Sequence, residues 1–280
     1  MSARLLDGRA QAAAILAEAR ALSRRRGRAP RLAIVAASGG AAGSYLKAKL
    51  KACAEAGVAV SVHRLSHGPR AKTLGLLADL AGDATVDALI VETPYPRGLT
   101  PADVAAAIPA AKDAEGVTAE SYGRFFMAKS WDEAAGLTGP CTAVAIARLA
   151  RAAKVPLAGK RAVVIGRSAT VGRPAAHLLS TLDLTVTLAH SRTKNLAALC
   201  READVLVAAA GVPGLVKPSW IKRGALVLDA GVHLVRGKLV GDVARGAEKR
   251  AGAMTPVPGG VGPVTTAIAI LQAALLTERP

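Results

Sequence analysis

The chain has 280 residues, of which 51% are hydrophobic and 20% are charged, a composition that can bury a large core and excludes an intrinsically disordered basic protein. Its 37 Lys and Arg outnumber its 20 Asp and Glu, so the formal net charge is +17 and a polyanionic partner such as nucleic acid is the first suggestion. No apolar run approaches the roughly 20 residues of a membrane-spanning helix, so we expect no membrane association and one or two domains.

The aromatic content argues against nucleic acid, because single-strand binders stack bases on aromatic rings and only two Trp, three Tyr and two Phe are present. The densest basic cluster is Arg24, Arg25, Arg26 and Arg28, at the end of an Ala-rich helical pattern, where positive charge suits a helix C-terminus. A solvated helix end is the simpler interpretation, and a basic nucleic-acid protein is the alternative.

The cysteines and the N-terminal residues indicate the cellular compartment in which the protein is expected. Cys53, Cys141 and Cys200 are far apart and show no metal-ligand spacing, which predicts a reducing compartment and no metal site. Asp7 and Glu18 interrupt an Arg- and Ala-rich N-terminus that otherwise looks like a transit peptide. We therefore expect no targeting segment and a cytoplasmic protein.

Short apolar runs alternate with Ala-rich helical segments along the chain, which predicts an α/β fold with parallel sheets covered on both faces. A polar stretch over 118–140 without a clear period separates two groups of candidate strands. We predict two α/β lobes flanking a cleft, which would be the default ligand site. The candidate strands are 32–36, 58–63, 87–91, 161–165, 184–189, 204–208 and 225–229.

In the first group, a glycine-rich turn follows the strand 32–36, and a helix begins near Ser44. Tyr45 and Lys49 are four residues apart and share one helical face. A partly desolvated lysine can act as general acid or base, and a tyrosine ring offers a flat surface to an aromatic substrate. From the pattern alone, a surface lysine and a half-buried tyrosine are the commoner outcome.

In the second group, the segment 159–174 places an apolar strand directly before a glycine-rich turn and a helix. Dinucleotide-binding folds hold a pyrophosphate in this way, with backbone N–H groups at the helix N-terminus. The spacing Gly166-x-Ser168-x-x-x-Gly172 is one residue longer than G-x-G-x-x-G and lacks the middle glycine. The context favours a Rossmann-type dinucleotide-binding domain, and an ordinary strand-to-helix turn is the alternative.

The residues after the next strand indicate which dinucleotide is bound. NAD sites place Asp or Glu there to accept hydrogen bonds from the ribose, whereas the segment 190–193 has no carboxylate. Arg167 and Ser191 can bind a 2′-phosphate instead, with Arg173 and Arg192 either assisting or simply solvated. The sequence therefore predicts NADP as the cofactor.

Seven short motifs follow one another between Tyr45 and Thr266. They are Tyr45-x-x-x-Lys49; Lys112-Asp113-Ala114-Glu115-Gly116; Pro140-Cys141-Thr142; Gly166-Arg167-Ser168 with Val171-Gly172 and Pro174; His190-Ser191-x-Thr193; Gly241-Asp242-Val243; and Thr255-Pro256-Val257-Pro258-Gly259-Gly260-Val261-Gly262-Pro263. Together they resemble the bifunctional methylenetetrahydrofolate dehydrogenase/methenyltetrahydrofolate cyclohydrolase family. The last motif is the most specific of the seven.

The resemblance implies a tetrahydrofolate-binding catalytic domain over 1–140 plus 264–280 and an NADP-binding Rossmann-type domain over 141–263. It implies oxidation of 5,10-methylenetetrahydrofolate by hydride transfer to NADP, followed by hydrolysis of the methenyl product to 10-formyltetrahydrofolate. It also implies a homodimer, and a final helix over about 263–276 that returns to the first lobe.

The same resemblance implies roles for individual residues. Lys49 would be the catalytic lysine, and Tyr45 would stack on the aminobenzoyl ring of the substrate. The other expected contacts are Asp113 and Glu115 with the pterin; Pro258, Gly259 and Gly260 in a loop over the pterin; and Thr142, Gly166, Arg167, Ser168, Ser191 and Val232 with the cofactor.

The sequence departs from the family pattern beside the catalytic lysine. The family usually has Val-Gln-Leu-Pro-Leu-Pro where this chain has the residues 91–96, so Glu92 replaces a glutamine that contacts the lysine. An ionised Glu92 would keep Lys49 as an ammonium and hinder its use as a base, whereas a protonated Glu92 would mimic the glutamine. Glu115 also replaces an aspartate, and Val264 a methionine.

Hydride transfer needs no such base. We therefore predict an NADP-dependent methylenetetrahydrofolate dehydrogenase with weak or absent cyclohydrolase activity. The full bifunctional enzyme is the alternative, and a one-carbon cofactor binder without catalysis is a further one.

Overall fold

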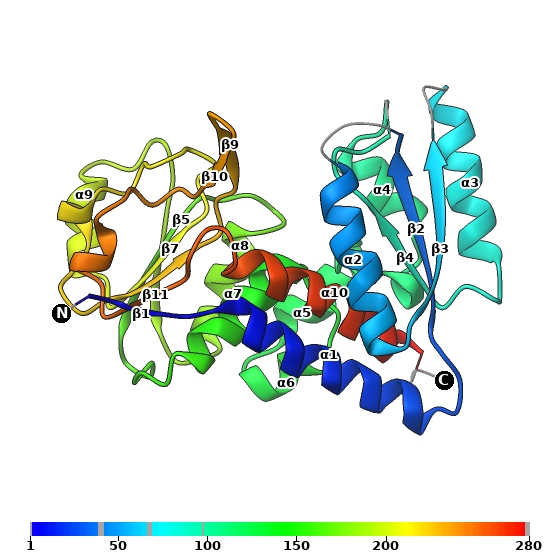
Figure 1. The fold of residues 1–280 in the computed structure, drawn as a ribbon, viewed down its shortest axis with the longest axis horizontal. Helices are drawn as coiled ribbons and strands as arrows, with labels where there is room; N and C mark the ends of the chain where they lie inside the picture. The colour runs from blue at the N-terminus through cyan, green and yellow to red at the C-terminus, as the bar shows by residue number, and fades with distance from the viewer. Residues whose placement is uncertain (1, 39–41, 66–68, 97, 278–280) are drawn as a thin grey trace. The chain divides into compact units, whose positions relative to one another are not determined.

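The computed structural model describes residues 2–38, 42–65, 69–96 and 98–277, with the side chains of 42–45 outside the described part. The chain divides into two compact units (Figure 1). Unit 1 comprises Met1–Ala12, Ala128–Ala135 and Pro140–Thr265, and unit 2 comprises Ala13–Met127, Gly136–Gly139 and Thr266–Pro280. Each unit contains a parallel sheet with helices, which confirms the predicted α/β class.

Unit 2 has a three-stranded parallel sheet in the order β3-β2-β4, whose strands are β2 (Arg31–Ala37), β3 (Ala59–Leu65) and β4 (Ala88–Val91). The central strand β2 pairs through Leu32 with Val60 on one side and Ala88 on the other. Both of its faces are covered, which explains why its sequence is a continuous apolar run. The three strands confirm the predicted ones within two residues.

The helices of unit 2 cover this sheet. Ala33 and Val35 of β2 share a core with α3 and α4 on one face. The helix α4 begins with a capping box, in which the Thr100 hydroxyl accepts from the backbone of Asp103 while the Asp103 carboxylate accepts from the backbone of Thr100. The helices with residues in unit 2 are α1 (Gly8–Arg25), α2 (Ala42–Ala56), α3 (Arg70–Gly82), α4 (Pro101–Ala107), α5 (Ala119–Met127) and α10 (Val261–Leu276).

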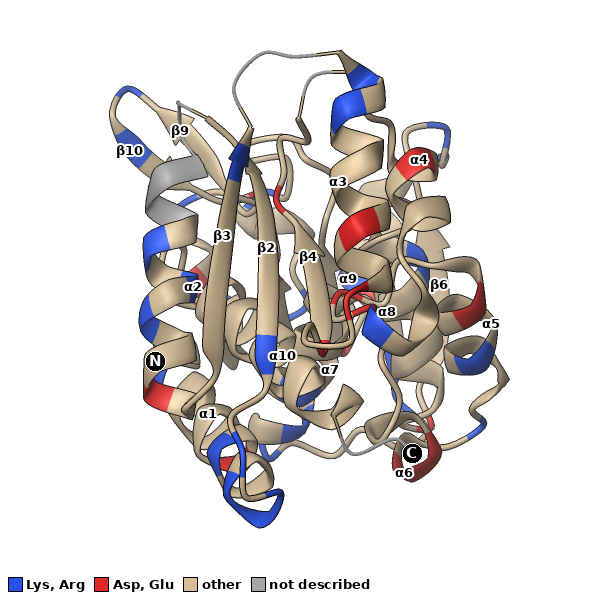
Figure 2. Cartoon of the chain, turned by 90° about the vertical axis from the view of Figure 1, so that its right-hand side faces the viewer, with Lys and Arg blue, Asp and Glu red and all other residues tan. Residues whose placement is uncertain are grey.

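The basic cluster lies at the end of α1, as a solvated helix end. Arg24 and Arg25 form the last turn of the helix, and all four arginines of the cluster are exposed. Figure 2 shows this segment as a blue turn at the end of α1. Arg28 also binds the Asp87 carboxylate through two nitrogens, at 2.5 and 2.6 Å, beside the first residue of β4. Part of the basic surplus is therefore paired within the protein.

The stretch over 118–140, which shows no period in the sequence, contains α5 and the five-residue helix α6 (Trp131–Ala135). Helices of nine and five residues are too short to repeat a 3.6-residue pattern clearly. The residues of α6 belong to unit 1, where the Trp131 N–H donates to the Thr181 carbonyl and the Arg151 guanidinium lies 4.8 Å from the Trp131 ring. The sequence had assigned them to the first lobe.

Unit 1 has a six-stranded parallel sheet in the order β1-β11-β8-β7-β5-β6. The four strands predicted in this part are confirmed as β5 (Arg161–Ile165), β6 (Thr185–Ala189), β7 (Val205–Ala208) and β8 (Leu226–Asp229). Two short strands complete the sheet: β11 (Ala253–Met254) pairs with β8, and β1 (Arg4–Leu5) pairs with β11. This pairing places the N-terminal residues in unit 1 rather than in the first lobe predicted from the sequence.

The helices of unit 1 include α7 (Cys141–Ala152), α8 (Gly172–Ser180) and α9 (Leu196–Glu202), and a β9–β10 hairpin (His233–Val235 and Lys238–Val240) follows β8. In this sheet β5 lies between β6 and β7, so the chain turns to opposite sides after β5 and after β6. Ligands of open α/β sheets bind at such a switch point, outside the carboxyl ends of the strands.

Across the described residues, we find no helix that combines the length and the apolar character needed to cross a membrane.

Candidate functional site

A buried lysine in unit 2 lies between two carboxylates from other segments. Lys49 of α2 is 7% exposed, and its ammonium forms an ion pair with Oε1 of Glu92, which is 8% exposed. Oε1 of Glu115 lies 3.9 Å from the same nitrogen. The structure therefore brings together three residues that the sequence proposed separately, and we call them the lysine cluster.

Sheet pairing positions the two carboxylates of this cluster. The Glu92 N–H donates to the Val35 carbonyl at 2.8 Å, so the β2–β4 ladder continues one residue beyond β4. An isolated bridge joins Leu89 of β4 to Asp113, which brings the segment carrying Glu115 beside the same strand.

Asp113 shapes the turn that carries Glu115. Its side chain is fully buried, and its carboxylate accepts backbone hydrogen bonds from Glu115, Val117 and Thr118 at 3.3, 3.2 and 2.8 Å. Sequence reasoning expected a pterin contact here. Three backbone N–H groups donate to this carboxylate, so Asp113 holds the turn that carries Glu115, and its predicted contact with the pterin stays a prediction.

Gln272 of α10 also supports this turn, and sequence reasoning missed it. Its amide donates to the Ala114 carbonyl at 2.8 Å and accepts from the Gly139 N–H at 2.6 Å. A glutamine within an otherwise apolar helix is the sequence signal that could have identified this residue, because a buried amide needs hydrogen-bond partners.

Glu115 exchanges its proton close to neutral pH. Burial among protein atoms, the largest effect, raises the pKa of Glu115 to about 7, although 26% of its side chain is exposed to solvent. The Lys49 ammonium lowers this pKa, and the charges of Glu92 and Asp113 raise it. At neutral pH the lysine cluster therefore contains a carboxyl group that can both accept and release a proton.

Two further side chains lie near the cluster. Burial and then the charge of Glu115 raise the pKa of the Tyr95 phenol, which remains protonated beside Glu115. Burial raises the pKa of the Cys53 thiol to about 12 in spite of Lys49, so this thiol is no nucleophile. Tyr45 occupies α2 one turn before Lys49, but its side chain lies outside the described part, and its stacking role stays a prediction.

The glycine-rich turn of unit 1 connects β5 to α8 and requires its glycines. Gly166 has a φ of +121°, and a Cβ there would lie 2.0 Å from the Ala209 carbonyl oxygen. A Cβ on Gly172 would lie 1.9 Å from the Gly166 carbonyl oxygen. The Ser168 hydroxyl accepts from the backbone of Val171 and Gly172, at 3.2 and 3.3 Å. The turn is thus folded tightly against the N-terminus of α8.

The donors around this turn fit a phosphate-bearing dinucleotide. Arg167 and Ser168 are exposed on the turn, and Ser191 and Arg192 are exposed after the neighbouring strand β6. Positions 166–172 and 190–193 contain no carboxylate. Hydroxyl, backbone and guanidinium donors without an acidic group suit phosphate oxygens. Thr142 lies at the start of α7, half-buried.

Asp242 holds the loop after β7. The sequence shows this residue within the motif Gly241-Asp242-Val243 but did not predict a role for it. It is fully buried, and its Oδ2 accepts the N–H groups of Ala210 and Gly211 at 2.6 and 2.8 Å. Its Oδ1 lies 2.7 Å from Nε2 of His233. This carboxylate therefore joins the loop after β7 to the start of the β9–β10 hairpin.

Asp229, the last residue of β8, completes this arrangement. It accepts the N–H groups of Gly231, Asp242 and Val243 at 2.9, 3.0 and 2.9 Å. Burial raises its pKa most, and the charge of Asp242 adds to the effect. Both carboxylates hold loops at the carboxyl edge of the sheet. Val232 lies between Asp229 and Asp242 in the sequence and is 42% exposed. An acidic residue at the end of a fully apolar strand is the signal that could have identified Asp229.

The loop with Pro258, Gly259 and Gly260 lies in unit 1, between β11 and α10. The Gly8 N–H donates to the Gly259 carbonyl at 2.9 Å, and a Cβ on Gly8 would lie 1.8 Å from the Gly260 carbonyl oxygen. The lysine cluster belongs to unit 2. The predicted contact of this loop with a pterin therefore stays a prediction.

Among the described residues, no group of three or more His, Cys, Asp or Glu side chains is arranged to hold a metal ion.

Comparison with known proteins covers both units. Residues 6–115 match the family described as tetrahydrofolate dehydrogenase/cyclohydrolase, catalytic domain, and residues 140–279 match the NAD(P)-binding domain of the same family. The bifunctional protein FolD of Parafrankia sp. (strain EAN1pec) is 45% identical over 271 residues, which cover 94% of this chain and 95% of that protein.

Solved structures agree with these matches. The bifunctional methylenetetrahydrofolate dehydrogenase/cyclohydrolase FolD of Campylobacter jejuni is 32% identical with a TM-score of 0.90, and the alignment covers 100% of both chains. The Trypanosoma brucei enzyme, solved with NADP and an inhibitor, is 33% identical with a TM-score of 0.88 over 99% of this chain and 98% of that one. The chain therefore belongs to the tetrahydrofolate dehydrogenase/cyclohydrolase family and carries that family's NAD(P)-binding domain.

Proposed function

We propose that the protein is a bifunctional enzyme that oxidises 5,10-methylenetetrahydrofolate with NADP and hydrolyses the methenyl product to 10-formyltetrahydrofolate. The lysine cluster, in which Lys49 is buried between Glu92 and Glu115, is the observation that carries this proposal. The expected loss of cyclohydrolase activity gains no support from the comparisons, because similar full-length relatives bear bifunctional names. The bifunctional alternative is therefore the better one.

For the oxidation, NADP supplies the acceptor of the hydride, and the residues of unit 1 bind and orient it. We assign Arg167, Ser191 and Arg192 to the phosphate on the ribose, because they are exposed donors on and beside the turn. Ser168 holds the turn at the N-terminus of α8. No residue of the lysine cluster has to remove a proton in this step. The charge of Glu92 is therefore compatible with oxidation.

For the hydrolysis, a water molecule adds to the methenyl carbon and loses one proton to a base. The bond between that carbon and N5 then breaks as the remaining hydroxyl proton moves to N5, which leaves the formyl group on N10. An ionised Glu92 stabilises the ammonium form of Lys49, which makes Lys49 a poor proton acceptor. Glu115 has a pKa of about 7, close to the value that suits a general base at neutral pH. We assign proton acceptance to Glu115 and assign Lys49 the role of orienting the reactants by hydrogen bonding. This division of roles allows hydrolysis to persist beside Glu92.

The decisive experiment follows NADPH formation and methenyl hydrolysis separately with the purified chain. We expect hydrolysis of supplied 5,10-methenyltetrahydrofolate faster than in buffer, and its loss by about 100-fold or more in Lys49→Met, because a small misplacement of the reactants can cost this much in rate. Lys47→Met is the matched control, because Lys47 is exposed on the same helix. Hydrolysis no faster than in buffer, with NADPH formation intact, would favour the dehydrogenase without cyclohydrolase activity.

A further inference from the structure

A pocket in unit 1 lies at the edge of the sheet opposite to the glycine-rich turn between β5 and α8. Its cavity of about 380 Å³ is bordered by the amino ends of β5, β7, β8 and β11 and by β1. The turns with Gly166 and Ser191 follow the carboxyl ends of β5 and β6. Parallel strands of four or five residues at about 3.3 Å per residue separate the two edges. The pocket is therefore distinct from the proposed cofactor site.

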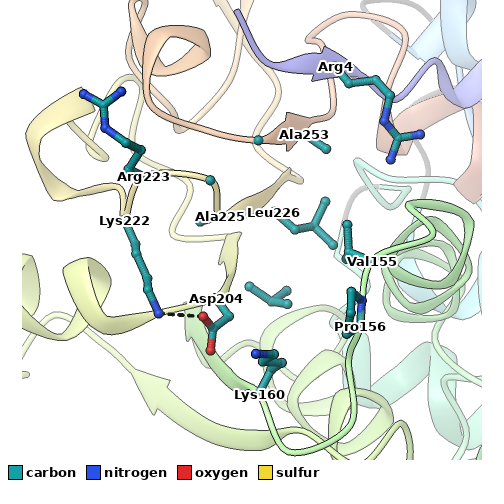
Figure 3. Close-up of a pocket in the computed structure, with 13 residues that line it drawn as sticks. Arg4, Val155, Pro156, Lys160, Asp204, Lys222, Arg223, Ala225, Leu226 and Ala253 are labelled. Atoms are coloured by element: carbon teal, nitrogen blue, oxygen red, sulfur yellow. Dashed lines mark hydrogen bonds and ion pairs between the residues drawn. The ribbon is translucent and has the colours of Figure 1, made fainter. Parts of the chain in front are cut away.

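Four cationic residues from three parts of the chain line this pocket. Arg4 comes from β1, Lys160 directly precedes β5, and Lys222 and Arg223 lie in the turn before β8. Figure 3 shows Arg4 on one side of the pocket and Lys222 on the other. The Arg4 guanidinium also donates to the Ala153 carbonyl, which holds it at the rim. Such convergence is a property of the fold, because these residues are far apart in sequence.

Asp204 is the acidic residue that lines the pocket, and it is already neutralised. Its carboxylate accepts from Lys222 Nζ at 2.6 Å and from the Arg161 N–H at 3.1 Å. The hydrogen bond from Lys222 is the largest effect that lowers its pKa, so Asp204 is ionised at neutral pH. Four cations and one carboxylate leave a formal charge of +3 on the lining. Concave walls concentrate such a field more than a flat surface does.

The floor of the pocket is apolar. Val155, Pro156 and Leu226 line it between the cationic sides (Figure 3). The cavity volume lies in the range of small-molecule sites, which combine apolar walls with a few charged groups. An inorganic ion would use the cations but not this floor, and a cavity of this volume suits a small molecule rather than a polymer.

We propose that this pocket binds a small organic anion with a phosphate or two carboxylates on an apolar body. Lys160, Lys222 and Arg223 attract the anionic group, while Val155 and Leu226 contact the body of the ligand. Asp204 opposes binding through its charge. The proposal does not depend on the reaction carried out by the lysine cluster.

Phenyl phosphate is a suitable probe, and binding to the full chain can be measured by isothermal titration calorimetry. Lys160→Ala combined with Arg223→Ala should weaken binding by about tenfold or more, since hydrogen bonds between charged groups are the strong ones. Asp204→Asn should tighten binding, because it removes the negative charge and keeps an oxygen for the Arg161 N–H. The opposite signs distinguish a binding site from structural damage, which would weaken binding in both variants.

Lys238→Ala combined with Arg245→Ala is the control, because it removes the same charge from two exposed positions away from the pocket lining. We expect this control to bind like the parent protein, benzyl alcohol not to bind, and saturating NADP to leave the phenyl phosphate isotherm unchanged. Absence of heat with phenyl phosphate, displacement by NADP, or an equal effect of the control pair would each overturn the proposal. If the parent protein showed neither dehydrogenase nor cyclohydrolase activity, the binding of phenyl phosphate to this pocket would be unaffected.

Discussion

At the scale of single residues, the central feature is one ammonium group shared by two carboxylates. Lys49 pairs directly with Glu92 and lies 3.9 Å from Glu115. Burial and then the negative charges of Glu92 and Asp113 raise the pKa of Glu115, while the Lys49 ammonium lowers it. Proton transfer near neutral pH therefore belongs to Glu115, whose pKa depends on its burial and on the charges of the neighbouring residues.

Replacing Glu92 should change the pH at which hydrolysis begins. The charge of Glu92 raises the pKa of Glu115, so Glu92→Gln should lower it, and hydrolysis should reach half of its maximum at a lower pH. If the pKa of Glu115 falls by one unit, the rate at a given pH on the acidic limb of the profile should rise about tenfold. The measurement is the pH profile of methenyl hydrolysis, with Glu55→Gln, an exposed position on α2, as the control. An unchanged profile would exclude Glu115 as the proton acceptor.

Glu115 should also make stability depend on pH. Its pKa is higher in the folded protein than in the unfolded chain, so its contribution to stability is present below about 4.5 and is lost as the pH rises through about 7. Glu115→Gln should lose less stability than the parent protein between pH 5 and 8. Urea unfolding at several pH values tests this. Parallel curves for the two proteins would show that Glu115 titrates as it does in the unfolded chain.

At the scale of elements, the positions of loops depend on buried polar groups as much as on strands. Asp242 and Asp229 accept five backbone N–H groups at the carboxyl edge of the unit 1 sheet. Asp113 does the same for one turn of unit 2. These carboxylates replace hydrogen bonds that regular secondary structure would have provided.

Removing the acceptor in the first of these networks should affect cofactor binding. In Asp242→Asn an amide nitrogen can replace the oxygen that accepts the N–H groups of Ala210 and Gly211. The NH2 group of the new side chain would then face these two N–H groups, and no acceptor would lie between them. We expect a loss of about 1–3 kcal/mol in unfolding free energy. We also expect a KM for NADP that rises more than the KM for the folate substrate. Thermal unfolding and steady-state kinetics test this against Asp183→Asn, an exposed position. Equal changes in both KM values would indicate general damage instead.

The glycine turn allows a test at the same scale. Gly172→Ala places a Cβ 1.9 Å from a backbone oxygen, so the turn must move and NADP binding should be lost. Gly123→Ala is the matched control, because a Cβ there meets nothing within 4 Å and alanine favours the helix α5. Titration with NADPH, followed by the fluorescence of its reduced nicotinamide, measures cofactor binding by both variants. Unimpaired binding by Gly172→Ala would show that the cofactor does not use this turn.

At the scale of the whole molecule, the charge of +17 bears on its ligands. NADP and folate are small polyanions, and an excess of cations raises their local concentration. Part of the excess is paired internally, as in Arg28 with Asp87. Another part of the excess, including Lys160 and Lys222, lines the pocket at the sheet edge opposite to the glycine-rich turn.

This charge predicts salt-dependent affinity for the cofactor. The Debye length falls from about 10 Å at 0.1 M salt to about 3 Å at 1 M, so the KM for NADP should rise severalfold over this range. The rate at saturating NADP should change less, because it does not include cofactor association. Steady-state kinetics in potassium chloride measures both quantities. A KM that is independent of salt would show that the net charge does not assist binding.

The sequence by itself determined the α/β class, seven strands, the glycine turn between β5 and α8, and the family, because each depends on residues that are adjacent along the chain. It did not reveal β1 and β11, since two-residue strands carry no pattern and form only because β8 supplies an edge. Nor did it reveal α5 and α6, whose length is too short for a clear period.

Only the tertiary structure decided which groups surround the candidate site residues. The sequence named Lys49, Glu92 and Glu115, but their contact requires the β2–β4 pairing and the Asp113 turn to bring three distant segments together. The sequence also could not show that three backbone N–H groups donate to the Asp113 carboxylate, because those hydrogen bonds require the folded turn. The physical reason is the same in each case. Local patterns specify elements, whereas the proton affinity and hydrogen-bond partners of a buried side chain depend on which other segments remove water from it.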